Sequence, residues 1–118
     1  MSQQYTFLSK SKFVKGLQCH KALFLHIHNP ELADPVPPDR EALFQSGFEV
    51  GELAQGLFPG GTVIPYEGHS YDEQIDLTRQ AMENGNGVVY EAAFNYDGVF
   101  VKVDILRRGP GGWEMYEV

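Results

Sequence analysis

The feature that most constrains this chain is the dipeptide Asp97-Gly98, which lies between two β-rich runs, VVYEAAFNY and VFVKVDILR. An Asp-Gly dipeptide between such runs is the strongest short-range signal for a two-residue β-hairpin. The turn also fixes the register, so Tyr96 is expected to face Val99. The sequence therefore predicts an antiparallel strand pair at this point.

Side chains alternate between the two faces of a strand. By this alternation we expect one face to be apolar and to form the core side, with Tyr90, Phe94, Tyr96, Val99, Val101, Val103 and Ile105. The other face would carry Val89 and Leu106 and would place Glu91 opposite Asp104, with Lys102 nearby. Like charges directly opposite each other are unfavourable in a sheet. The pair therefore indicates either the solvated side of a half-exposed sheet or a site that binds a cation.

A second connection, Gly109–Gly112, leads to a third strand-like segment, WEMYEV. If these four residues form the loop, Arg108 faces Trp113, and Glu117 joins Asp104 on the acidic face. A register shift of one residue would turn Glu117 away from that face. Hard divalent cations such as Mg²⁺ and Mn²⁺ prefer oxygen ligands. With the first register, the sequence predicts a three-carboxylate metal site.

The stretch VVYEAAFNYDGVFVKVDILRRGPGGWEMYEV resembles the core of a RecB-like nuclease of the PD-(D/E)XK superfamily. It follows LSKSKFVKGLQC and FQSGFEVGELAQGLFPGG, an order similar to that in a bacterial RecB-like family of unknown function. The resemblance implies that Asp104 and Glu117 are catalytic metal ligands and that the Val118 carbonyl can also bind metal. Glu91 matches an acid often seen on the first strand of these nucleases. The implied activity is Mg²⁺- or Mn²⁺-dependent hydrolysis of phosphodiester bonds in DNA.

In that family Val118 would be the intervening position, and a catalytic Lys would follow it directly. We therefore expect a truncated piece of a metal-dependent DNA nuclease, which binds metal weakly and does not cleave DNA. The alternative is a non-catalytic module that uses a nuclease-like fold to bind nucleic acid or protein. A truncated sheet would expose apolar surface or a bare strand edge, so self-association is also expected.

Residues 40–58 show apolar side chains at helical spacing, with Gly47 and Gly51 on the same side. Glycine lowers helix stability relative to alanine, so two glycines on one face indicate close packing on the sheet. In RecB-like enzymes this helix often holds a metal-binding His at the place of Gly51. Glu52 beside it could substitute as a metal ligand, and an exposed helix glutamate is the alternative.

The first 28 residues carry four lysines and no acid, although the whole chain has a formal net charge of −7. These lysines, Lys10, Lys12, Lys15 and Lys21, could neutralise phosphates of a nucleic acid. The alternative is a solvated helix face. Ser9 is expected to cap a first helix that breaks near Gly16, and a second helix is expected from Lys21 to His28.

Cys19 is the only cysteine, so an internal disulfide is excluded and a reducing compartment is favoured. On its own it is expected to be a small core residue. Some RecB-like nucleases use a cysteine at the matching place as one of four iron–sulfur ligands, so the resemblance implies a cluster only if downstream sequence supplies the others. We find no run long enough for a membrane span or signal peptide, and we expect a cytoplasmic protein without a membrane partner.

Together these patterns predict an α+β fold. We expect a helical N-terminal arm over residues 1–30, a proline-rich connector over 31–39, and over 40–118 the N-terminal part of a restriction-endonuclease-like core. In that core two helices would pack on a three-stranded antiparallel sheet. The second of these helices is expected to begin at a capping box, Ser70 to Glu73, and to end at Gly85. A short strand is expected from Thr62 to Tyr66.

Overall fold

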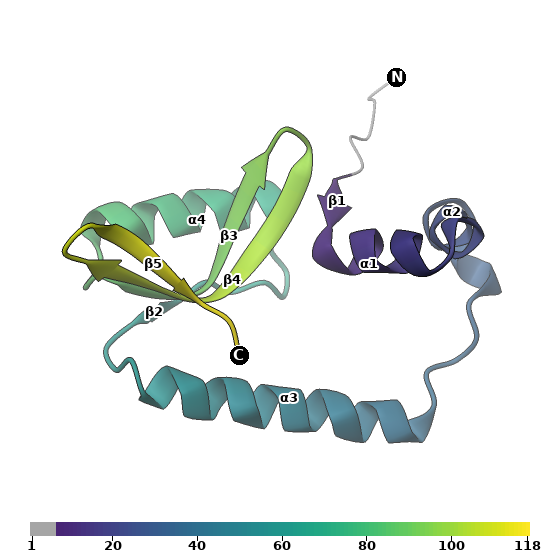
Figure 1. The fold of residues 1–118 in the computed structure, drawn as a ribbon, viewed down its shortest axis with the longest axis horizontal. Coiled ribbons are helices and arrows are strands. Elements are labelled where there is room, and N and C mark those ends of the chain that lie inside the picture. The colour runs from purple at the N-terminus through teal and green to yellow at the C-terminus, as the bar shows by residue number, and fades with distance from the viewer. Residues whose placement is uncertain (1–6) are drawn as a thin grey trace.

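A computed structural model describes residues 7–118 and combines helices with a mixed β-sheet (Figure 1). In chain order the elements are β1 (Leu8–Ser9), α1 (Lys10–Gln18), α2 (His20–His28), the 3₁₀ helix η1 (Pro30–Leu32), α3 (Pro38–Gly56), β2 (Thr62–Val63), α4 (Tyr71–Asn84), β3 (Val88–Tyr96), β4 (Val99–Gly109) and β5 (Gly112–Tyr116). The predicted α+β class is thus confirmed.

The five strands form one sheet in the order β1-β4-β3-β2, and β5 also pairs with β4. β3 with β4 and β4 with β5 are antiparallel, whereas β1 with β4 and β2 with β3 are parallel. The sheet is therefore mixed, and the expectation of three antiparallel strands is wrong in this respect. β1 has only two residues, and a strand this short has no periodicity that a sequence pattern could reveal.

Both hairpin registers agree with the sequence prediction. Tyr96 pairs with Val99 across Asp97-Gly98, whose positive φ angles of 50° and 78° are those of a type I′ turn. Arg108 pairs with Trp113, and Gly109 also pairs with Gly112, so the second loop has two unpaired residues instead of four. β5 ends at Tyr116, which leaves Glu117 just beyond the strand.

The alternation of side chains slips by one residue at Glu91. This residue has a φ of 58°. The residues of β3 and β4 pair in a continuous register, except that Glu91 and Asp104 do not form a strand pair. Val89 and Ala92, three residues apart, consequently lie in the same core. A left-handed residue inside a strand reverses the side-chain direction, and only the structure reveals it.

The expected core face is therefore wrong in part. The core consists of Ile64, Ala81, Val89, Ala92, Val103 and Leu106. Val89 and Leu106 were assigned to the acidic face by strict alternation, whereas Ile105 lines a cavity together with Glu91 and Asp104. Tyr96, Val99 and Val101 were expected in the core but are exposed.

Helix α4 covers the core face of the sheet. It begins at the predicted capping box, in which Ser70 and Glu73 each bind the other's backbone N–H, and Gly85 is its C-cap. Thr78 is buried, and its hydroxyl donates to the Gln74 carbonyl and accepts from the Ala93 N–H at 2.9 Å. This contact satisfies a buried donor on β3 and fixes α4 against the strand.

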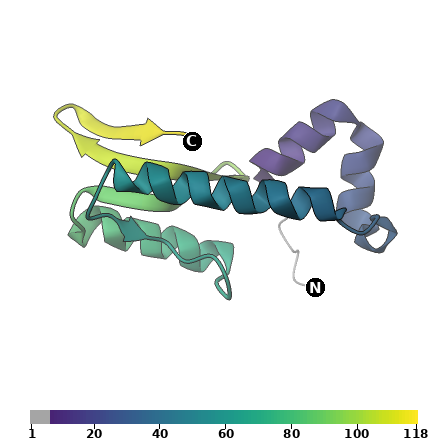
Figure 2. The same cartoon turned by 90° about the horizontal axis from the view of Figure 1, so that it is seen from below.

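Helix α3 runs past the opposite face of the sheet without burying any of its residues (Figure 2). It begins at Pro38, two residues earlier than expected, because proline is favoured in the first turn of a helix. A side chain added at Gly47 or Gly51 would meet no atom within 4 Å. The prediction that these glycines pack closely on the sheet is therefore wrong.

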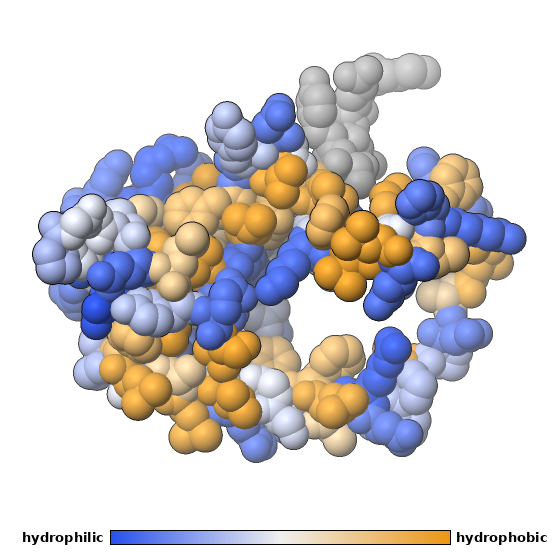
Figure 3. Space-filling view, viewed as in Figure 1, coloured by the Kyte–Doolittle hydropathy of each residue, from blue (hydrophilic) through white to orange (hydrophobic). Residues whose placement is uncertain are grey.

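The end of α3 is held by Tyr90. This side chain is 6% exposed, and its hydroxyl donates to the carbonyl oxygens of Phe58 and Gln55 and accepts from the Gly61 N–H at 3.1 Å. The rest of α3 exposes its apolar side chains, which Figure 3 shows facing solvent along the lower edge of the molecule. Within residues 7–118 no helix is both long enough and apolar enough to cross a membrane.

The N-terminal arm consists of α1 and α2. The Ser9 hydroxyl accepts from the Lys12 N–H and caps α1, as predicted. Gly16 does not break this helix: it is buried inside α1, and a Cβ there would lie 2.9 Å from Leu23 of α2. The break falls at Cys19, where the backbone is extended. Gly16 therefore allows close packing of the two helices.

Candidate functional site

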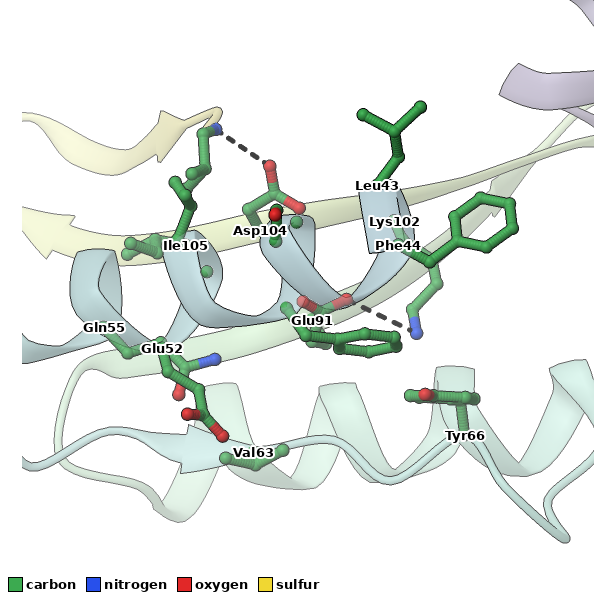
Figure 4. Close-up of a pocket in the computed structure, with 16 residues that line it drawn as sticks. Leu43, Phe44, Glu52, Gln55, Val63, Tyr66, Glu91, Lys102, Asp104 and Ile105 are labelled. Carbon is green, nitrogen blue, oxygen red and sulfur yellow. Dashed lines mark hydrogen bonds and ion pairs between the residues drawn. The ribbon is translucent and has the colours of Figure 1, made fainter. Parts of the chain in front are cut away.

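The first candidate site is a cavity of about 950 Å³ between α3 and the acidic face of the sheet (Figure 4). The sheet contributes Glu91, Lys102, Asp104 and Ile105, together with Val63 of β2, and the segment between β2 and α4 contributes Tyr66. The α3 side is mostly apolar and includes Leu43, Phe44 and Phe48, together with Glu52. The cavity therefore places a small set of charged groups next to an apolar wall, which is typical of ligand sites.

Glu91 reaches this cavity because of its left-handed backbone. Its carboxylate lies 3.6 Å from the Lys102 ammonium, and the two side chains are only 35% and 27% exposed. The same ammonium lies 4.6 Å from the centre of the Tyr66 ring. Left-handed backbone is costly for a residue other than glycine and gathers at functional sites. This makes Glu91 the most unusual residue in the cavity.

Asp104 lies at the centre of the acidic region. It is half-buried, and its Oδ2 accepts a hydrogen bond of 2.9 Å from the backbone N–H of Val118. Val118 lines the same cavity, because the residues after β5 continue beside β4. Asp104 and Val118 are thus brought together as the sequence predicted, although here the Val118 N–H, not the carbonyl, makes the contact.

Glu117 faces an adjoining cavity. Its carboxylate lies 3.1 Å from the Lys10 ammonium of α1, and both side chains are largely exposed. Asp104 lines both cavities, whereas Glu91 lines only the first and Glu117 only the second. Across residues 7–118, no three Asp, Glu, His or Cys side chains gather closely enough to hold one metal ion. The predicted three-carboxylate cluster is therefore not assembled in this conformation.

Glu52 lies on α3 at the far side of the first cavity. It is exposed, and Figure 4 shows its carboxylate directed toward Val63 and away from Asp104. Its presence in the lining keeps it a candidate ligand. Its exposure equally fits the alternative of an ordinary surface glutamate.

The four lysines of the arm do not form one patch. Lys10 pairs with Glu117, and the Lys12 ammonium donates to the Phe7 carbonyl at 3.1 Å. Lys15 lines the second cavity, and Lys21 is exposed on α2. Only Lys10 and Lys15 therefore face a common space.

Cys19 is exposed at the junction of α1 and α2, so the prediction of a buried core cysteine is wrong. The bend in the backbone at this residue turns its position outward. A lone exposed thiol gives no support of its own to an iron–sulfur cluster, which needs four ligands.

A second charged group on the sheet was not predicted from the sequence. Arg107 pairs across the strands with Glu114, and its guanidinium lies 2.7 Å from that carboxylate, which also accepts from the Tyr116 hydroxyl at 2.9 Å. The hydrogen bond from Arg107, followed by that from Tyr116, lowers the pKa of Glu114. The predicted register of the second hairpin already placed Arg107 opposite Glu114 and could have revealed this pair.

No family model, curated protein or solved structure matches the chain. The function must therefore be inferred from the geometry of the two cavities.

The carboxylates of the first cavity can be compared with the ligands that a divalent metal ion needs. Mg²⁺ is commonly held by only one or two carboxylates and keeps several waters, so Asp104 and Glu91 fit a hydrated ion even without a third acid.

Proposed function

We propose that residues 40–118 form part of the core of a metal-dependent DNA nuclease with a restriction-endonuclease-like fold. The observation that carries this proposal is the left-handed Glu91, which directs a second carboxylate to the cavity that Asp104 also lines. A strand residue is not expected to adopt this conformation without compensation. Metal binding by the two acids would provide that compensation.

In this proposal Asp104 and Glu91 hold a hydrated Mg²⁺ or Mn²⁺, with Glu117, Glu52 and Val118 as further candidate ligands. A bound divalent ion would polarise a phosphate oxygen and lower the pKa of a bound water. Lys102 neutralises Glu91 and offers a cation to an incoming phosphate. The apolar side chains of α3 exclude water from one side of the cavity.

We expect residues 1–118 to bind the metal without measurable cleavage of DNA. Among the described residues that line the first cavity, Lys102 is the sole cation, and its ammonium is already bound to Glu91. No second lysine is then positioned there to orient an attacking water. Asp104 likewise has a backbone partner, which a metal would have to displace or share.

The alternative function is a non-catalytic module that binds nucleic acid or protein. The observation that favours it is that all three acids already have partners within the chain: Lys102 for Glu91, the Val118 N–H for Asp104 and Lys10 for Glu117. With these partners, none of the three acids needs a metal ion to balance its charge.

Calorimetric titration with Mn²⁺ distinguishes the two functions. We expect weak binding that Asp104→Asn and Glu91→Gln each reduce, because each removes one carboxylate of the proposed set. Glu83→Gln is the matched control, since Glu83 is an exposed acid of α4 outside both cavities. Equal Mn²⁺ affinity in all four proteins would reject the metal site and favour the module. A DNA cleavage assay on the same samples tests the expected lack of activity.

A further inference from the structure

The second cavity has a volume of about 830 Å³ and lies between α1, the segment that precedes α4, and β4. This volume is within the range of about 300 to 1,000 Å³ that is usual for small-molecule sites. Three lysines and two carboxylates line it, namely Lys10, Lys15, Lys102, Asp104 and Glu117. The lining is thus locally positive in a chain whose formal net charge is −7.

The oxygen of a buried amide in this lining lacks a hydrogen-bond partner. Gln74 is 3% exposed, and its Nε2 donates to the His69 carbonyl at 3.2 Å. That bond fixes the amide orientation, because only the NH₂ group can donate to a carbonyl. Its Oε1 has no partner among the described residues. An unpaired buried acceptor is costly, and a ligand N–H group would satisfy it.

The opposite side of the cavity favours an anion. Lys10 and Ser11 lie in the first turn of α1, which contains no acidic residue, and Lys15 lies in its last turn. A helix N-terminus has a positive partial charge, so Lys10 there repels it, and an anion would relieve this repulsion. Glu117 offsets only Lys10. Within residues 7–118 no carboxylate pairs with Lys15, whose ammonium is left to bind the anion.

Aromatic rings also line this cavity. Tyr71 stacks on the buried Phe100 with ring centroids 4.1 Å apart and an angle of 13°, yet it remains 41% exposed. Tyr66 is 44% exposed and also lines the cavity. Such rings bind nucleobases by stacking, whatever the base.

We propose that this second cavity binds a single unpaired nucleotide. The phosphate lies beside α1 and binds Lys15, the base stacks on Tyr66 or Tyr71, and an N–H group of the base donates to Gln74 Oε1. A paired base has its Watson–Crick donors occupied, so the cavity selects unpaired nucleotides. This inference requires no metal and stands apart from the proposed hydrolysis.

The test is calorimetric titration, in EDTA, with three probes: dAMP, a short 5′-phosphorylated single-stranded DNA, and the same DNA as a duplex. EDTA removes divalent metal, so failure of the metal site does not affect the result. We expect the single strand to bind more tightly than the duplex. Binding of dAMP as tightly as the single strand identifies a free nucleotide as the ligand, whereas tighter binding of the strand identifies an unpaired strand end.

Three variants locate the site. Lys15→Glu is expected to weaken dAMP binding at least about tenfold, because a hydrogen bond to a charged group is lost. Tyr66→Leu is expected to weaken it about fivefold or more through lost stacking. Gln74→Met keeps a similar volume and is expected to retain the melting temperature while losing affinity. Lys21→Glu is the matched control, because it makes the same charge change on the arm outside the cavity.

The proposal is overturned if neither dAMP nor the single strand binds. It is also overturned if the duplex binds as tightly as the single strand, or if Lys15→Glu and Lys21→Glu weaken binding equally, since either result indicates non-specific attraction to the basic arm. Unchanged affinity in a folded Gln74→Met protein would remove the amide from the site and reject base recognition there.

Discussion

Glu91 and Lys102 come from neighbouring strands, and their charged groups meet at 3.6 Å in the cavity beside α3. In the proposed function, this ammonium competes with a divalent ion for the same carboxylate. The pair is partly exposed, so its interaction is expected to be modest. It nevertheless gives the metal proposal a direct test.

We predict that Lys102→Gln raises Mn²⁺ affinity by about two- to fivefold, because a competing charge worth up to about 1 kcal/mol is removed. Calorimetric titration at low ionic strength measures the change. Lys21→Gln is the control, since it lowers the positive charge of the protein equally but far from Glu91 in the sequence and outside the cavity. A decrease in affinity for Lys102→Gln would contradict the competition.

The backbone of Glu91 gives a second prediction. Left-handed backbone costs a non-glycine residue about 1 to 2 kcal/mol, and glycine loses about 0.5 to 1 kcal/mol more chain entropy on folding. Glu91→Gly is therefore expected to be more stable than Glu91→Ala by up to about 1 kcal/mol. Both variants lack the carboxylate, so the comparison isolates the backbone. Urea denaturation measures it, and a more stable Ala variant would show that residue 91 is not strained.

Local sequence signals predicted the hairpins and caps well. Asp97-Gly98 set the register of β3 and β4, and the capping box set the start of α4, because each depends on a few adjacent residues. The slip at Glu91 could not be predicted in this way. A positive φ at a glutamate has no residue-type signal, and it reversed the assignment of Val89 to the acidic face.

The acidic site was predicted only in part, for a related reason. The predicted register placed Asp104 between Glu91 and Glu117, whereas in the structure Glu91 and Glu117 line two adjoining cavities. In the second cavity Glu117 pairs with Lys10, which lies 107 positions away in the sequence. Contacts over such distances depend on how the arm packs, which no local pattern specifies.

The stability of the folded protein is expected to depend on pH through Glu114, which is bound by Arg107 and Tyr116. Hydrogen bonds from Arg107 and then Tyr116 lower the pKa of Glu114 from its ordinary value of 4.5. The folded protein thus holds this proton less tightly than the unfolded chain. The stabilisation is complete above pH 4.5 and is lost as the pH falls through the lower pKa of the folded state.

We therefore expect the melting temperature to fall on acidification below pH 4.5 and the fall to be smaller in Glu114→Gln. At neutral pH the same variant should melt lower, because Arg107 loses its charged partner. Thermal melts over a pH series measure both effects, with Glu83→Gln as the control for loss of an exposed acid. Parallel curves for the wild type and Glu114→Gln would exclude the coupling.

The Tyr90 hydroxyl is expected to stabilise the end of α3. Its hydroxyl bonds to the carbonyls of Phe58 and Gln55 and to the Gly61 N–H, so Tyr90→Phe is expected to cost about 1 to 2 kcal/mol of unfolding free energy. The segment after α3 should also become more sensitive to limited proteolysis. Tyr96→Phe is the matched control, because Tyr96 is 86% exposed. Equal stability of the two variants would reject the role of the Tyr90 hydroxyl.

The exposed apolar side chains of α3 are expected to make the protein self-associate. Leu53 of α3 is 75% exposed, Leu57, its C-cap residue, is 78% exposed, and no residue of α3 is buried. Contiguous exposed apolar surface of this kind promotes association in water. The expectation from sequence located this surface on the sheet, whereas the structure places much of it on the helix.

We predict that sedimentation velocity shows larger species as the protein concentration rises and that the double substitution Leu53→Gln and Leu57→Gln reduces them. Leu17→Gln on the arm is the control, since Leu17 is 70% exposed but lies outside α3. A strict monomer at every concentration would contradict association, and an equal effect of Leu17→Gln would show that general apolar exposure, and not α3, causes it.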